Sequence, residues 1–208
     1  MNKRGLVIAG LLCLFLFSAS QAQETPTPQT VLVFNGPINE ATMSRLIITV
    51  QEKVRQGAKA ITILINSNGG GVDAALAAYG YLRGLPVTIT THNFGVVDSA
   101  AVILYCAGTK RLASPDSRFV LHGLSLTFRD IPIDENQIGE QLRILQLQTN
   151  IMASIFAKTT GKTPQAIKDA ITAKTALSSQ QAKDWNLVTA IESKLYERGD
   201  DVNFVPLP

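Results

Sequence analysis

The chain has 208 residues, which is enough for a single domain with its own hydrophobic core. Its formal charge of +3 falls to +1 once Lys3 and Arg4 at the N-terminus are set aside. The remaining basic residues form no cluster, so a nucleic-acid partner is not indicated. No metal-ligand spacing of Cys and His is present, and no phosphate-binding lysine follows the glycines. We therefore expect no metal, no ATP and no other cofactor.

The first segment is typical of a secretory signal peptide. Basic residues precede an apolar run from Gly5 to Phe17, and Ser20-Gln21-Ala22 offers small residues where a signal peptidase cleaves. The run of 13 residues is short for a membrane span, which needs roughly twenty. We therefore expect a signal peptide at 1–22, cleavage near Ala22 and an exported protein, periplasmic or secreted. A retained N-terminal anchor is the alternative.

Three segments should follow the signal peptide. Residues 23–30, which include two prolines, form a polar leader, 31–192 form the folded domain, and 193–208 form a polar C-terminal tail. Cys106 is the only cysteine left after cleavage, so no internal disulfide can form. Because it lies in an apolar run, Cys106 should be a buried small hydrophobic residue.

Short apolar runs alternate with amphipathic segments along the domain. The apolar runs predict strands, and the amphipathic segments predict helices. In chain order we expect a strand at 31–34, a helix capped by Asn39, a strand at 60–65, a helix at 72–82, a strand at 87–91, a helix carrying Ser99, a strand at 117–122, and helices at 134–159, 164–173 and 178–184 before a last strand at 187–191. This order indicates an α/β fold with a mainly parallel sheet.

The helix at 134–159 is the longest of the predicted elements. Its apolar residues exceed the single stripe of a helix that faces only its own domain. We therefore expect the chain to form a homo-oligomer through this helix.

Three of the predicted strands end in residues that can carry out chemistry. The strand at 60–65 runs into the glycines 69–71, whose backbone N–H groups can be approached closely because glycine has no side chain. Another strand leads to Ser99 at the start of a helix, and a third ends on His122. Backbone donors, a hydroxyl and an imidazole are the groups needed for acyl transfer by a serine nucleophile. His92 also ends a strand but matches no motif, so we expect a structural role for it.

Five short motifs, in this order along the chain, resemble motifs of the proteolytic subunit of the Clp protease. Ile-Asn-Ser-Asn-Gly-Gly at 65–70 resembles that family's Ile-Asn-Ser-Pro-Gly-Gly, and Gly95 with Ser99-Ala100 resembles its Gly-x-Ala-Ser-Met turn. The others are Pro-Asp-Ser-Arg at 115–118 leading to His122, Thr-Gly-Lys-Thr at 160–163, and Leu-Ser-Ser-Gln-Gln-Ala at 177–182. The resemblance extends over residues 31–191.

The resemblance implies a ClpP/crotonase-like fold, a repeated ββα spiral with a long protruding handle helix that joins rings of subunits. It implies that Ser99 is the nucleophile and His122 its general base. The backbone N–H groups of Gly70 and Ala100 would form the oxyanion hole. The substrate would be a peptide or an unfolded protein, hydrolysed by a serine-type endopeptidase.

The sequence departs from the family pattern at two positions. The family's third triad member, an aspartate, precedes the Leu-Ser motif by three residues, and Lys174 occupies that position here. Asp98, directly before Ser99, is also foreign to the pattern. A cation beside the histidine would disfavour an imidazolium, so the third triad member is unknown. The site is a dyad, a rewired triad or a decayed active site.

Three function classes remain open on the sequence alone. The first is an exported serine peptidase of the Clp type, independent of an ATPase because ATP is scarce outside the cytoplasm. The second is an inactive oligomeric scaffold that keeps the fold. The third is a Ser–Lys peptidase of the signal-peptide-peptidase kind, with Lys110, Lys158 or Lys174 as base.

Overall fold

The computed structural model describes residues 28–126, 132 and 134–207. The predicted signal peptide and most of the polar leader lie outside the described residues. The strands are β1 (Thr30–Asn35), β2 (Ala60–Ser67), β3 (Thr88–Asp98), β4 (Lys110–Ala113), β5 (Arg118–Val120), β6 (Ala176–Ser178), β7 (Ala190–Ile191) and β8 (Asp201–Phe204). The helices are α1 (Glu40–Arg55), α2 (Val72–Arg83), α3 (Ala101–Tyr105), α4 (Glu135–Thr160), α5 (Pro164–Thr172) and α6 (Ser179–Asp184).

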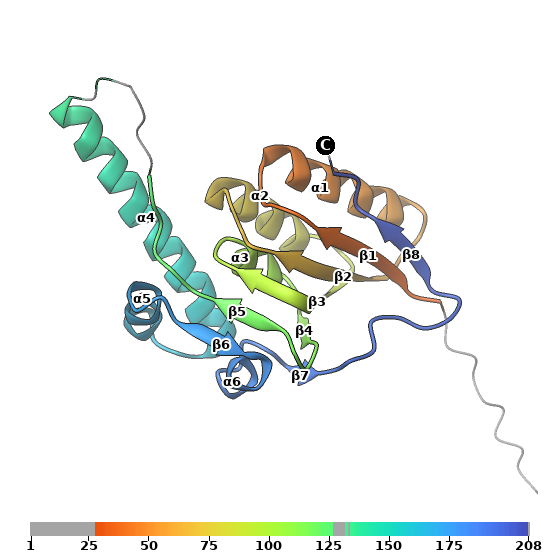
Figure 1. The fold of residues 1–208 in the computed structure, drawn as a ribbon. Coiled ribbons are helices and arrows are strands. Elements are labelled where there is room, and N and C mark those ends of the chain that lie inside the picture. Colours follow the sequence, from red (N-terminus) through yellow and green to blue (C-terminus); the bar gives the residue numbers. More distant parts are fainter. Residues whose placement is uncertain (1–27, 127–131, 133, 208) are drawn as a thin grey trace, which may run out of the picture.

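The strands form one sheet in the order β6-β5-β3-β2-β1-β8; β4 branches from β3, and β7 pairs with β4. The pairings are parallel, except that β5 and β6 are antiparallel. Helices α1, α2 and α3 lie together on one side of the central strands (Figure 1). Leu32 and Phe34 of β1 belong to the main core, whereas Val31 and Val33 belong to a smaller cluster on the other face. The α/β class with a mainly parallel sheet is therefore as predicted.

The C-terminal segment differs from the sequence-based expectation. The predicted last strand at 187–191 is reduced to β7, and the polar tail contains an additional strand, β8. This strand pairs in parallel with β1, with Val31 opposite Val202, and closes the outer edge of the sheet (Figure 1). Because only one short strand of mixed polarity is involved, its hydrophobic pattern is too weak to be recognised in the sequence.

Strand β3 is longer than predicted and changes partner along its length. Its first part, from Thr90 to Asn93, pairs with β4, and its last part, from Val96 to Asp98, pairs with β5. Between these parts the register with β2 shifts, so that β3 contains a bulge. The prediction ended this strand at residue 91 because Asn93 and Gly95 resemble turn residues. In the structure, Asn93 and Gly95 lie at the bulge within β3.

Helix α4 runs from residue 135 to 160, one position later at each end than predicted. Asp134 and Gln137 form a capping box at its start, and Gly161, with φ of 77°, ends it in the left-handed conformation. The second half of α4 is buried, whereas the first half extends beyond the sheet (Figure 1). Within the described part of the chain, no helix is both long and apolar enough to span a bilayer.

Candidate active site

Ser99 occupies a tight turn between β3 and α3. Its φ of 56° lies in the left-handed region, which costs a serine on the order of 1–3 kcal/mol. The Ser99 N–H donates to the Val120 carbonyl at 2.8 Å, which fixes the turn against the end of β5. The prediction placed Ser99 on a helix, but the helix begins only at Ala101. A strained turn from strand to helix is the backbone geometry that presents a nucleophile above a sheet.

The glycine loop after β2 packs directly against this turn. Gly69 has φ of 90°, and a Cβ built on it would lie 2.6 Å from the Asp98 carbonyl oxygen, 2.7 Å from Ser99 Cβ and 3.0 Å from Ala100 N. No side chain fits in that space. Glycine is therefore required at this position for two reasons, its backbone conformation and the close approach of the two loops.

Gly70 is held in place by hydrogen bonds on either side of it. Ile38 N–H donates to the Gly69 carbonyl at 2.9 Å, and Gly71 N–H donates to the Ile38 carbonyl at 2.8 Å. Among the described residues, neither the Gly70 N–H nor the Ala100 N–H has a protein acceptor. The structure thus places two unused backbone donors in the loops that meet at Ser99, as an oxyanion hole requires.

His122 lies just beyond the end of β5, two residues after the Val120 carbonyl that binds Ser99. Its Nδ1 is 2.8 Å from the Gly123 carbonyl oxygen. Because a carbonyl can only accept, Nδ1 carries the proton in this contact, and Nε2 is left with a lone pair that can accept one. In the part of the chain that the structure describes, no hydrogen bond joins Ser99 to His122.

Lys174 directly precedes the segment that pairs with β5. The antiparallel pairing of β5 with β6 continues past the strands, because Leu121 N–H donates to the Thr175 carbonyl at 2.8 Å. This register places residue 174 opposite residue 122. Lys174 is exposed and has φ of 52°, so its backbone is left-handed. Lys174 thus lies on the segment that runs beside the one carrying His122, one residue beyond the last hydrogen bond between them.

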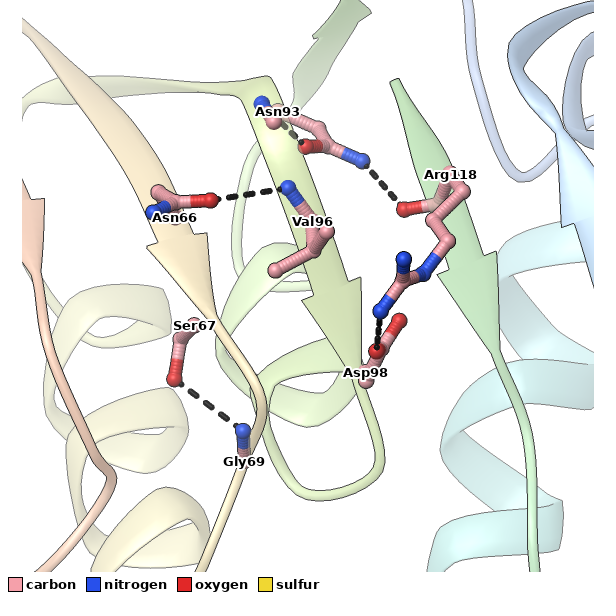
Figure 2. A network of polar contacts seen from close by, with 8 residues as sticks. Asn66, Ser67, Gly69, Asn93, Val96, Asp98 and Arg118 are labelled. Carbon is pink, nitrogen blue, oxygen red and sulfur yellow. Dashed lines mark hydrogen bonds and ion pairs between the residues drawn. The ribbon is translucent and has the colours of Figure 1, made fainter.

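Two asparagines that the sequence analysis did not single out hold the bulge of β3 (Figure 2). Asn66 Oδ1 accepts from Val96 N–H at 2.9 Å. Asn93 accepts from Gly95 N–H at 3.0 Å and donates to the Arg118 carbonyl at 2.8 Å. Asn66 lies in the Ile-Asn-Ser-Asn-Gly-Gly motif, which could have marked it, whereas Asn93 has no such motif around it. Their contacts direct β3 into the turn that carries Ser99.

A cleft of the described residues lies elsewhere on the sheet. It has a volume of about 750 Å³ and is formed by the first residues of β1 to β4 together with residues 192–200. His92 lies at this cleft, and its Nε2 donates to the Glu192 carbonyl at 3.1 Å. Burial lowers the pKa of His92. Neither Ser99 nor His122 lines this cleft. Among the described residues, no group of three or more His, Cys, Asp or Glu could hold a metal ion.

Comparisons with known proteins agree with the motifs. The family model described as Clp protease matches residues 23–194. The ATP-dependent Clp protease proteolytic subunit 2 of Mycobacterium tuberculosis is 32% identical over 139 residues, covering 63% of this chain and 62% of that protein. Subunit 1 of Corynebacterium jeikeium is 31% identical over 156 residues, covering 72% of this chain and 77% of that protein.

Solved structures give the same fold. The structure of a ClpP1 mutant from Listeria monocytogenes matches with a TM-score of 0.70 at 23% identity, covering 79% of this chain and 91% of that chain. The predicted ClpP-like fold, with α4 as its long helix, is thereby confirmed. The chain spans 62% of the length of the mycobacterial relative, so the match concerns the domain and not that whole protein. With 172 of its 208 residues inside the family model, this chain belongs to the Clp protease family.

Proposed function

We propose that the protein is a serine peptidase that hydrolyses peptides or unfolded proteins, with Ser99 as nucleophile and His122 as general base. The observation that carries this proposal is the left-handed turn at Ser99, which meets the glycine loop and the end of β5 at one point. Membership of the Clp protease family supports it. The third triad member remains unassigned.

The chemistry follows from the groups at this point. His122 Nε2 takes the proton of the Ser99 hydroxyl as Oγ bonds to the substrate carbonyl carbon, and the carbonyl π electrons move to oxygen. The N–H groups of Gly70 and Ala100 stabilise that oxyanion, and such a donor is worth about 2.7–4 kcal/mol. The imidazolium then protonates the leaving amine as the C–N bond breaks. Water hydrolyses the acyl-enzyme by the same steps in reverse order.

We propose that this peptidase is slow. A triad carboxylate normally fixes the imidazole tautomer and stabilises the imidazolium. Here the Gly123 carbonyl can fix the tautomer, but a neutral carbonyl stabilises the positive charge much less than a carboxylate does. The strand register, continued by one residue, brings Lys174 opposite His122, and a cation there would oppose that charge. The oxyanion donors and substrate binding must therefore supply most of the rate enhancement.

A fluorophosphonate probe, which reacts with activated serines, tests the proposal. Labelling should occur in the unaltered protein, disappear in Ser99→Ala and fall strongly in His122→Ala. Labelling that survives in His122→Ala but is lost in Lys174→Met would instead support the Ser–Lys mechanism. Lys110 is the weakest of the lysine candidates, because it pairs with Thr90 at the end of β3 remote from Ser99.

The inactive scaffold is the second candidate. It is favoured by two observations, the lysine at the family's aspartate position and the missing hydrogen bond between Ser99 and His122 among the described residues. If the unaltered protein and Ser99→Ala are equally unreactive towards the probe at every pH tested, the scaffold function replaces the peptidase.

We further propose a homo-oligomer assembled through α4. Four large aliphatic side chains on its projecting half are each at least 40% exposed: Ile138, Leu142, Ile144 and Leu147. Such a patch on a protruding helix is costly in water and is covered by association. Light scattering should show a species larger than a monomer, and Leu142→Gln with Leu147→Gln should reduce its mass.

Export and independence from an ATPase belong to the same proposal. The sequence of residues 1–22 supports cleavage near Ala22, and N-terminal sequencing of exported protein that begins at Met1 would contradict it. The curated relatives are named ATP-dependent. We expect this protein, in contrast, to hydrolyse short peptides with no ATP and no ATPase present. The test is a peptide-hydrolysis assay from which both ATP and any ATPase are left out.

A further inference from the structure

Two costly features occupy consecutive positions at the proposed site. Ser99 has a strained backbone, and Asp98 before it is the only carboxylate that is buried among the described residues, at 8% exposure. Asp98 Oδ1 is shielded from solvent and has no hydrogen-bond partner in that part of the chain. A buried carboxylate oxygen without a partner costs stability, so its presence calls for an explanation.

Arg118 is the one partner that the structure gives to the Asp98 side chain. Its Nη2 donates to Asp98 Oδ2 at 3.0 Å, from a side chain that is 56% exposed to one that is 11% exposed (Figure 2). In the pairing of β3 with β5, Val96 is opposite Arg118 and Asp98 is opposite Val120. The ion pair therefore runs diagonally between the two strands on one face of the sheet.

The ion pair joins the end of the strand that precedes Ser99 to the start of the strand that precedes His122. Asp98 is the last residue of β3 and is followed at once by Ser99. Arg118 begins β5, the strand that leads to His122. Three residue pairs join β3 to β5, and two hydrogen bonds to β5 carbonyls, from the Asn93 side chain and from the Ser99 N–H, also connect them. Among the described residues, the Asp98–Arg118 ion pair is the link between these strands that depends on two side chains.

We propose that the Asp98–Arg118 ion pair positions Ser99 relative to His122 by fixing the end of the nucleophile's strand to the strand of the base. This inference rests on the proposed peptidase function and names residues that the motifs do not assign. Because Oδ1 is inaccessible to solvent and Oδ2 accepts from Arg118, we assign Asp98 a positioning role that acts through Arg118. A charged pair suits this role because it is directional and resists the small sliding that an apolar contact permits.

The test compares Asp98→Asn, Arg118→Gln and the double variant in peptide hydrolysis and in the rate of fluorophosphonate labelling. The matched control is Lys53→Gln, which breaks the Lys53–Asp201 ion pair at the far edge of the sheet. That pair also joins a more exposed to a less exposed side chain at a similar separation of 2.9 Å, but there the cation is the less exposed partner, with Lys53 at 14% and Asp201 at 52%. Thermal unfolding of each variant shows that it is folded at the assay temperature.

We expect either single variant to lower kcat and the labelling rate about tenfold or more, with KM within about a factor of two. The kcat of the double variant should not fall below that of the less active single variant, because each single substitution already removes the same ion pair. Arg118→Lys should recover part of the rate, and Lys53→Gln should change nothing. Arg118 is more than half exposed, so its variants remain informative even where Asp98→Asn fails to fold.

Three results would overturn the inference. Unchanged kcat in both single variants removes the positioning role while leaving the peptidase intact. A loss in Asp98→Asn with normal Arg118→Gln shows that the carboxylate supports His122 directly, as a relocated triad acid. Failure of the unaltered protein to react at Ser99 refutes the proposed function itself, and the positioning role falls with it.

Discussion

Replacing Lys174 by aspartate is the most direct test of why this site should be slow. The substitution restores a carboxylate to the position opposite His122. The backbone there has φ of 52°, a conformation that aspartate and asparagine tolerate better than most residues. Lys174 is exposed, so the shorter side chain leaves no cavity. We therefore expect Lys174→Asp to fold at least as well as the unaltered chain.

The size of the effect can be bounded from two directions. A carboxylate about 4 Å from an imidazolium contributes about 1 kcal/mol in bulk water and about 4 kcal/mol near a protein surface. In a serine-protease template, exchange of the triad carboxylate for its amide lowers turnover about 10⁴-fold. Because residue 174 is exposed and solvent screens the new charge, we expect the lower part of this range. That corresponds to a rise in peptide hydrolysis of about tenfold, or about 1.4 kcal/mol in barrier.

The assay is kcat/KM for a short fluorogenic peptide, with Ser99→Ala in the same background as the blank. Lys174→Asn is the matched control, because it removes the cation and keeps the backbone preference but adds no charge. Removal of the cation alone should give a smaller rise than Lys174→Asp. Equal activity of the two variants would refute the reasoning, because the added carboxylate would then have no effect. A fall in Lys174→Asp would show that the lysine itself is a working base or a structural cation.

Three further predictions concern stability and reactivity. Gly69→Ala should lower the midpoint of urea unfolding far more than Gly57→Ala, because both glycines have positive φ but only the added Cβ at Gly69 meets other atoms, the nearest at 2.6 Å. Cys106, whose pKa is raised by burial to about 11, should resist a thiol reagent at pH 8 in the folded protein and react once it is unfolded. Burial lowers the pKa of His92, so the unfolded chain binds a proton at this group more tightly than the folded chain does. The free energy of unfolding should therefore be unaffected by this group above about pH 6.5 and should fall as the pH drops towards the folded-state pKa. In denaturant titrations at several pH values, His92→Gln should flatten that slope.

The sequence contained enough information for the order of most elements and for the fold family. Helix α1 begins after the capping residue Asn39, as predicted, and α5 begins at Pro164 after its Thr163 cap. Strong hydrophobic periodicity and local capping residues act over a few positions, so they can be recognised without tertiary contacts. The five motifs added the family, which composition and periodicity alone do not distinguish from other α/β folds.

The predictions that failed depend on contacts between distant segments. The second half of β3 contains Asn93 and Gly95, which look like turn residues until Asn66 from β2 fills the bulge. Strand β8 exists because β1 offers it an edge, and nothing in its own four residues requires a strand. The proximity of Asp98 to Arg118 likewise depends on the register of β3 with β5, which no local pattern encodes.

The candidate site divides into two parts that rest on different physics. The nucleophile and oxyanion part is built from main-chain geometry, namely the positive φ of Ser99, Gly69 and Gly70 and the packing of their loops. This part is costly to keep, since a scaffold gains nothing from a left-handed serine, and Ser99→Gly alone would relieve the strain. The base part of the proposed site depends on the charge around His122, and a lysine at position 174 would be unfavourable there. A chain with the costly backbone part and weak charge support is better explained by slow catalysis than by lost catalysis. Reactivity at Ser99, more than the rate of turnover, therefore decides between a slow peptidase and an inactive scaffold.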